Sequence, residues 1–243
     1  NIWVAGGIGT NAVAYSYDGI NWRGVGAITS GSISTTECTS LVWTGTLFVG
    51  VSQTSVFTSP DGIQWTLYYN ITNQIQLDKL ATNGNIIIAT PISGSGFPML
   101  YTTDPTLGFS PILNDLFFND QVQEYTDILY DGTNFIVTVG LRGNPINSKF
   151  YSPNESLWTG ISNTAYVNGY NIGLHKSKSI YISTGNTPNS AEISNDGIRW
   201  RQINDPVLDA FIFAQGVKGS IFSTQNYIII CGTNNNNFIY STD

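Results

Sequence analysis

A short motif, Ser-x-Asp-Gly-x-x-Trp, recurs along this chain and constrains the fold more than any other sequence feature. It is complete in AYSYDGINW at 14–22, FTSPDGIQW at 57–65 and EISNDGIRW at 192–200. When looser copies are included, the position of the motif serine returns every 42 to 50 residues, at Ser16, Ser59, Thr102, Ser152, Ser194 and Ser241. A period of this length is typical of a structural unit that stacks against copies of itself.

Each repeat is predicted to form four β-strands. An apolar run, a polar turn and a second apolar run precede each motif, as in SLVWTGTLFVGV at 40–51 and KLATNGNIIIAT at 79–90. Short runs rich in Ile, Val, Phe and Tyr, bounded by Gly, Asn and Thr, are typical of strands. A third strand ends at the motif serine, and a fourth begins near the motif tryptophan. Four strands in a repeat of this length predict an all-β fold, a β-propeller with one blade per repeat.

We expect six four-stranded blades in a single domain that covers residues 1–243. The approximate repeats are 1–36, 37–74, 75–123, 124–167, 168–217 and 218–243. Asn1 aligns with the turn between the first two strands of a blade, and Asp243 falls inside the motif turn, so the first and last blades should each lack one strand. This suggests a longer parent chain or an assembly, with the missing strands deleted, disordered or donated by a partner. Five or seven blades are the alternatives if the copies are unevenly formed.

The motif itself is predicted to be structural. Glycine accepts a positive φ in a tight turn, and the aspartate can accept hydrogen bonds from nearby backbone N–H groups. The serine hydroxyl can tie the third strand to the turn, and the tryptophan offers a large apolar surface to a neighbouring blade. Catalysis needs unlike groups at one place, whereas six copies around a ring point to six places. The residues with this structural role are Ser16, Asp18, Trp22, Ser59, Asp61, Trp65, Ser194, Asp196 and Trp200.

The motif resembles a shortened Asp-box, the Ser-x-Asp-x-Gly-x-x-Trp turn that joins strands three and four of a blade in sialidase-type (BNR-like) propellers. The phrases YSYDGINW, WVAGG and IFSTQ also resemble propeller repeats in proteins of large DNA viruses and some bacteria. The resemblance extends through essentially the whole chain and implies a propeller. It implies little about activity, because propellers have many functions.

In the sialidases that this motif resembles, three arginines clamp the substrate carboxylate. A Tyr–Glu nucleophile pair and an Asp acid/base carry out the reaction. Here Arg23, Arg199 and Arg201 flank motif tryptophans in the expected outer strand, and only Arg142 lies in a loop that could reach a ligand. The arginine triad is missing, so we expect no sialidase activity and assign no catalytic residue.

A generic glycosidase would need two carboxylates across a cleft. Four acids lie at or near the start of the first strand in three successive repeats: Glu37, Asp78, Glu124 and Asp127. If the first strand is innermost, some of them face the central channel. They could hold a cation or form a catalytic pair, or they could be solvated groups that line a wet channel.

The composition excludes several partner classes. Charged residues make up only 10% of the chain and the net charge is −7, so no basic patch is available for nucleic acid or for an anionic membrane surface. The lone His175 and the two cysteines, Cys38 and Cys231, match no metal spacing. We therefore expect two buried free thiols, no metal, no cofactor and no membrane insertion.

Asn-, Gly-, Ser- and Thr-rich loops between the second and third strands are the predicted binding face. Their amide groups both donate and accept hydrogen bonds, which suits a glycan or a protein partner, although a compositional bias toward Asn would give ordinary turns of the same sequence. The candidate binding residues are Phe97, Arg142, Asn144, Asn147, Asn186, Asn189, Asn234 and Asn235. Asn70 and Asn154 match glycosylation acceptor sites, as chance alone would also produce in so Asn-rich a chain.

The sequence thus favours a non-catalytic binding or structural display module that recognises glycans or a protein partner. The expected setting is extracellular or on a virion surface. The alternative is a carbohydrate-active, glycosidase-like enzyme that uses the channel carboxylates.

Overall fold

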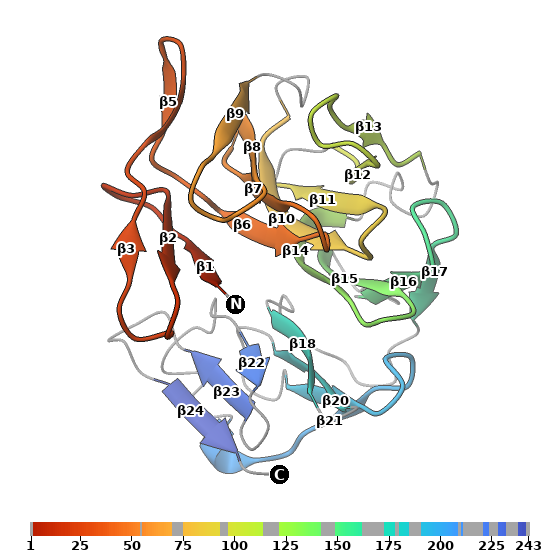
Figure 1. The fold of residues 1–243 in the computed structure, drawn as a ribbon. Coiled ribbons are helices and arrows are strands. Elements are labelled where there is room, and N and C mark those ends of the chain that lie inside the picture. Colours follow the sequence, from red (N-terminus) through yellow and green to blue (C-terminus); the bar gives the residue numbers. More distant parts are fainter. Residues whose placement is uncertain are drawn as a thin grey trace. The chain divides into compact units, whose positions relative to one another are not determined.

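The computed structural model describes residues 2–53, 55–69, 75–92, 97–113, 122–141, 149–161, 173–177, 180–184, 191–208, 210, 221–223, 228–231 and 238–241. The chain divides into two compact units, unit 1 at 1–113 and unit 2 at 114–243. Both consist of antiparallel β-sheets (Figure 1). That the two units form a single domain stays a prediction.

Unit 1 contains three sheets of the repeat, in which strands that follow one another in the chain are neighbours in the sheet. The strands are β1 (Trp3–Gly6), β2 (Val13–Ser16) and β3 (Arg23–Gly24) in sheet 1; β6 (Ser40–Trp43), β7 (Phe48–Val51), β8 (Ser55–Ser59) and β9 (Thr66–Tyr69) in sheet 2; and β10 (Leu77–Thr82), β11 (Ile87–Pro91), β12 (Leu100–Thr102) and β13 (Ser110–Pro111) in sheet 3.

Unit 2 contains three further sheets with the same up-and-down order. The strands are β14 (Val122–Tyr130), β15 (Phe135–Leu141), β16 (Lys149–Ser152) and β17 (Thr159–Ile161) in sheet 4; β18 (Gly173–Ser177), β19 (Ile180–Thr184), β20 (Glu192–Ser194) and β21 (Arg201–Gln202) in sheet 5; and β22 (Ile221–Ser223), β23 (Ile228–Cys231) and β24 (Phe238–Ser241) in sheet 6.

The strand pattern confirms the prediction from the repeat. Among the described residues, sheets 1 and 6 have three strands each, and sheets 2 to 5 have four. Two details make the expectation more exact. The strand β14 begins at Val122, two residues before the predicted boundary, and the motif tryptophans Trp22, Trp65 and Trp200 each lie one residue before the fourth strand.

A separate two-stranded hairpin, β4 (Ile28–Ser30) and β5 (Ile33–Thr35), was not expected from the repeat. It occupies the link between sheets 1 and 2. Gly31, with a φ of 60°, supplies the left-handed conformation that its tight turn requires. The strand β4 lies against β9, and Ile28 is buried in one apolar cluster with Leu67 of that strand.

The first strands of consecutive sheets are neighbours within each unit. In unit 1, β6 lies beside β1 and β10, and in unit 2, β18 lies beside β14 and β22. The backbone N–H of Leu80 in β10 donates to Ser40 Oγ in β6 at 3.0 Å, which links sheets 2 and 3 directly. The sheets therefore stack side by side along their first strands, as blades do.

The apolar cores lie between consecutive sheets. One cluster joins sheets 2 and 3, another joins sheets 4 and 5, and a third joins sheets 5 and 6. Between sheets 1 and 2, the fully buried ring of Phe57 occupies the space above Gly50, where a Cβ would lie 2.2 Å from Phe57 Cε2. A side chain at position 50 would therefore displace the phenylalanine on which this core is built.

Candidate functional site

The motif turns are held by side-chain hydrogen bonds of the serine and the aspartate. In the first copy, Ser16 Oγ donates to Asp18 Oδ1 at 2.9 Å and accepts from the backbone N–H of Gly19 at 2.9 Å. Asp18 Oδ1 also accepts from the backbone N–H groups of Ile20 at 2.8 Å and Asn21 at 2.7 Å. Gly19 has a φ of 74°, a conformation that side chains other than glycine rarely adopt.

The same network recurs in the other complete copies. Asp61 Oδ1 accepts from two backbone N–H groups at 2.8 Å each, and Asp196 Oδ1 accepts from two at 2.9 and 2.7 Å. In the looser fourth copy, Asn154 Oδ1 accepts from the backbone N–H groups of Ser156 at 2.9 Å and Leu157 at 3.0 Å. An amide oxygen thus supports the turn as a carboxylate does.

Backbone N–H groups hold the pKa of the motif aspartates well below the usual range, since these hydrogen bonds favour the charged carboxylate. A carboxyl whose pKa is lower in the folded state stabilises the fold above its unfolded pKa, near 3.8. That contribution to stability is lost as the pH falls through the pKa of the carboxyl in the folded state.

We therefore expect the melting temperature to fall as the pH is lowered from 4 to 2.5. A triple variant, Asp18→Asn, Asp61→Asn and Asp196→Asn, should be less stable at pH 7 and should show a smaller fall, because Asn keeps the turn geometry without a titrating group. Thermal denaturation followed by circular dichroism across this pH range checks the prediction. Equal pH slopes in the two proteins would contradict it.

The motif tryptophans share one hydrogen bond but differ in burial. The indole Nε1 donates to the carbonyl oxygen of the motif glycine at 3.2 Å in Trp22, 3.1 Å in Trp65 and 3.0 Å in Trp200. Trp200 is buried, with 7% of its surface exposed, Trp65 is half-buried, and Trp22 is 45% exposed. The motif therefore fixes the orientation of the indole, while the neighbouring residues determine how much of it is covered.

The exposed Trp22 belongs to an apolar surface on the first motif turn. Trp3, 61% exposed, lies opposite Ser16 in the sheet, and a Cβ built on Gly19 would be 3.7 Å from its Nε1. Ile20 in the same turn is 81% exposed. We call Trp3, Ile20 and Trp22 the turn surface. Trp3 and Trp22 lie against Gly19 of this turn, and hydrogen bonds to Asp18 hold the backbone of the turn.

The predicted loop residues fall almost entirely outside the described part of the chain. Phe97 is described, and its side chain is 48% exposed. Arg142, Asn144, Asn147, Asn186, Asn189, Asn234 and Asn235 lie outside the described residues, as does the Asn70 acceptor site. Their role in binding stays a prediction.

The predicted channel acids lie on or just before first strands. Glu37 precedes β6 and forms an isolated bridge with Ile8, whereas Asp78 lies in β10 and pairs with the neighbouring Lys79 at 3.7 Å. Asp127 in β14 accepts from the backbone N–H of Ile128 at 2.9 Å. Glu124 also lies in β14, but its side chain is outside the described residues. A catalytic or cation-binding role for these acids stays a hypothesis.

Cys38 is a buried free thiol, and burial raises its pKa to about 12. A buried thiol that stays protonated fills space in the core and does not act as a nucleophile. The side chains of Cys231 and His175 lie outside the described residues. Within the described ranges, no three His, Cys, Asp or Glu side chains cluster as metal ligands would. Nor does any helix there have the length and hydropathy needed to cross a membrane.

A buried ion pair was not predicted from the sequence. Lys149 Nζ in β16 bonds Glu192 Oε2 in β20, and both side chains are fully buried between sheets 4 and 5. The ammonium also lies 4.6 Å from the ring centroid of Trp200, which is a cation–π geometry. Burial lowers the pKa of Lys149, and the Glu192 carboxylate opposes that shift. The pair therefore links two sheets in a dry environment.

Solved structures identify the fold. A chain of a nidogen–laminin complex matches with a TM-score of 0.65 and 11% identity, over 100% of this chain and 89% of that one. The GH74 enzyme of Niastella koreensis matches with a TM-score of 0.60 and 16% identity, over 98% of this chain and 36% of that one. The chain has the β-propeller fold. The predicted fold class is thus confirmed.

A further propeller match has a small bound partner. The structure of YCF48 bound to a D1 peptide matches with a TM-score of 0.54 and 15% identity, over 83% of this chain and 61% of that one. No protein-family model matches the sequence, and no curated protein sequence matches it. The resemblance to sialidase-type Asp-box proteins is thus supported at the level of the propeller fold. That the chain belongs to this family stays a prediction.

Proposed function

We propose that this propeller is a non-catalytic protein-binding module whose partner contacts the turn surface, Trp3, Ile20 and Trp22. The observation that carries the proposal is the exposure of two indoles and an aliphatic side chain around one rigid turn. Exposed apolar side chains that gather in one place commonly mark interaction sites.

The physical chemistry of the turn surface suits a protein partner. Tryptophan is enriched among the residues that dominate binding energy, and its rigid ring loses little conformational entropy on binding. Both indoles lie against Gly19, and the hydrogen bonds of Asp18 fix that turn before any partner arrives. Such pre-organisation lowers the entropic cost of association. The very exposed Ile20 adds an aliphatic contact, which favours a protein surface over a sugar ring.

Two similar structures support this class of function. One belongs to a nidogen–laminin complex, and the other is YCF48 with a D1 peptide bound. The resemblance of the repeat to those of large DNA viruses supports a setting on a virion or cell exterior. The similarity to a GH74 enzyme supports the alternative, a carbohydrate-active enzyme that uses the channel acids.

The test is a binding screen with matched variants. The wild-type chain and a Trp3→Ala, Trp22→Ala double variant are applied to a protein array and to a glycan array. The control variant is Trp43→Ala, which removes an indole of similar exposure (46%) that lies in β6 and not on the first motif turn. We expect binding to a protein that weakens at least about tenfold in the double variant and stays unchanged in the control, because truncation of such anchors commonly costs more than about 1.4 kcal/mol.

Other outcomes would overturn the proposal. Protein binding that survives the double variant would place the contact elsewhere. Binding to glycans alone would show carbohydrate recognition. Hydrolysis of a polysaccharide that is lost in an Asp78→Asn, Asp127→Asn variant would favour the enzyme.

A further inference from the structure

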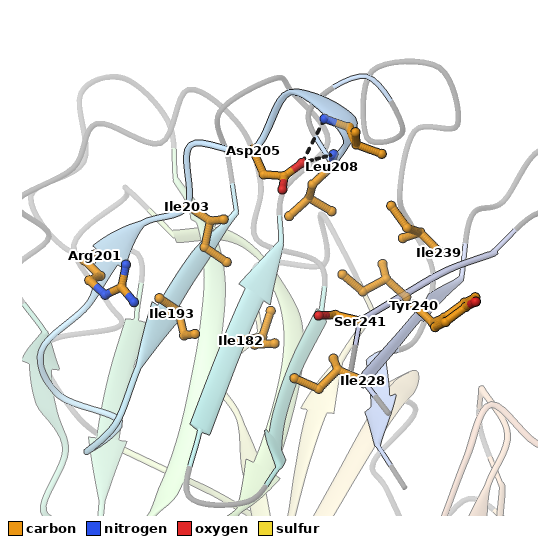
Figure 2. Close-up of a pocket in the computed structure, with 12 residues that line it drawn as sticks. Ile182, Ile193, Arg201, Ile203, Asp205, Leu208, Ile228, Ile239, Tyr240 and Ser241 are labelled. Carbon is orange, nitrogen blue, oxygen red and sulfur yellow. Dashed lines mark hydrogen bonds between the residues drawn. The ribbon is translucent and has the colours of Figure 1, made fainter. Parts of the chain in front are cut away.

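A cavity of about 480 Å³ lies between sheets 5 and 6 of unit 2. Isoleucines from both sheets line it, and Figure 2 shows Ile182, Ile193 and Ile228 pointing into the same space. A helical turn at 206–208 covers one end, where Asp205 Oδ1 accepts from the backbone N–H groups of Val207 at 2.8 Å and Leu208 at 2.9 Å. The lining is therefore mainly apolar, with Arg201, Asp205 and Ser241 as its polar members, and strands and a helical turn hold it in place.

The corresponding place between sheets 4 and 5 is occupied by Trp200. This indole is buried in one apolar cluster with Ile136, Ile161 and Tyr181, and Tyr151 packs against the cluster. The rings of Trp200 and Tyr181 are 6.4 Å apart in an edge-to-face arrangement. These four neighbours define a tryptophan site between two sheets.

The strand register shows that sheet 5 lines the cavity with the same strand positions that sheet 4 uses to contact Trp200. Ile136 pairs with Tyr151 in sheet 4, and Ile182 pairs with Ile193 at the same positions of sheet 5. Both members of the first pair contact the tryptophan cluster, and both members of the second line the cavity.

The remaining two walls correspond as well. Ile161 lies three residues after the motif tryptophan of sheet 4, and Ile203 lies three residues after Trp200 of sheet 5. Tyr181 is the partner of the motif serine in sheet 5, and Ile228 is the partner of the motif serine Ser241 in sheet 6. All four positions that surround Trp200 thus recur around the cavity.

Other sheets place an aromatic residue at this same position. In sheet 2, Trp65 packs against the apolar cluster that contains Val13 of sheet 1, and in sheet 3, Phe109 is buried in the cluster that contains Val49 of sheet 2. One position differs in chemistry at the cavity, because the buried Ala191 stands where sheet 4 has the charged Lys149. The cavity therefore keeps the apolar positions of a tryptophan site without a buried ammonium, while the exposed Arg201 lies in its lining.

We propose that this cavity binds the tryptophan of an extended segment that lies alongside β24, as β21 lies alongside β20. The occupant is a partner strand with the second half of the motif, Gly-x-x-Trp, followed by a strand of alternating apolar residues. The repeat supports this choice, because Trp65, Phe109 and Trp200 occupy the equivalent site elsewhere in the molecule. The proposal does not rest on the function proposed for the turn surface.

The test uses a peptide from this protein as the probe. A fluorescein-labelled peptide with the sequence of residues 197–203, GIRWRQI, is titrated with the full chain, and binding is followed by fluorescence anisotropy. We expect saturable binding, and at least about tenfold weaker binding of the same peptide with alanine in place of its tryptophan. Because the second peptide leaves the protein unchanged, this comparison does not depend on the folding of a variant.

Whether the peptide binds in the cavity is tested with Ile193→Trp. The new indole, at a half-buried position in the lining, should fill the cavity. This variant should abolish peptide binding, whereas Leu107→Trp, at a position that is 83% exposed in unit 1, should not. Equal binding of both peptides, or unchanged binding to a folded Ile193→Trp protein, would overturn the proposal. Competition by N-acetyltryptophanamide at the affinity of the peptide would also overturn it, since the site would then take a free aromatic molecule and not a strand.

Discussion

Replacement of Lys149 by alanine is expected to destabilise the protein by about 3–5 kcal/mol, because it leaves the Glu192 carboxylate buried without its partner. The structure gives Glu192 little else to bond, since its Oε1 has no hydrogen-bond partner among the described residues. Glu192→Ala should destabilise the protein by a similar amount, because it leaves the buried ammonium of Lys149 without its partner. Urea denaturation followed by intrinsic fluorescence measures both losses, and one of the six tryptophans, Trp200, lies beside the pair.

The double variant Lys149→Met, Glu192→Leu separates the strength of the pair from the cost of breaking it. Removal of both charges eliminates the desolvation penalty, so the double variant should be more stable than either single variant. The matched control is Lys79→Ala, which breaks the partly exposed Asp78–Lys79 pair and should change stability by at most about 1 kcal/mol. Single variants no more damaging than this control would show that the buried pair is energetically unimportant.

Trp200→Ala is expected to cost about 3–5 kcal/mol, in the range of buried tryptophan truncations, because it opens a large cavity between sheets 4 and 5. The same substitution at Trp22 should cost far less, since nearly half of that side chain is already in water. Trp65, which is half-buried against Phe57 and Phe48, should fall between the two.

This series tests what the motif contributes by itself. All three tryptophans make the same hydrogen bond to the motif glycine, so differences among the variants report the packing against neighbouring sheets. Free energies of unfolding from denaturant titration should follow the order of burial. Equal losses at Trp22 and Trp200 would mean that the local turn, and not the packing between sheets, makes the tryptophan important.

The periodic motif was sufficient to predict the fold. The motif turn, Asp-Gly in three copies and looser in the others, and the flanking apolar runs are local signals that recur through the chain, so the strand order follows from sequence alone. The hairpin β4–β5 escaped prediction because ITSGSIS at 28–34 occurs once and outside the repeat. Its strands are too short to give a periodic pattern.

The candidate sites were harder to predict because they depend on neighbours. Identical motif positions give an exposed Trp22 and a buried Trp200, and nothing within the motif distinguishes them. The buried pair did leave a signal. Glu192 lies two residues before the motif serine, where the equivalent residues Phe57 and Leu100 are apolar and buried, so a charge there breaks the pattern of the repeat.

The hairpin β4–β5 bears on how molecules of this protein behave toward one another. β9 is the last strand of sheet 2, and an exposed last strand invites pairing with a strand of another molecule. Because β4 lies against β9, the hairpin shields that edge and buries Ile28 and Leu67 with it. A chain without residues 27–36 would keep the strands of all six sheets, but β9 would become an exposed edge strand that can pair with another copy of the chain. We therefore expect the hairpin to limit aggregation in concentrated solution.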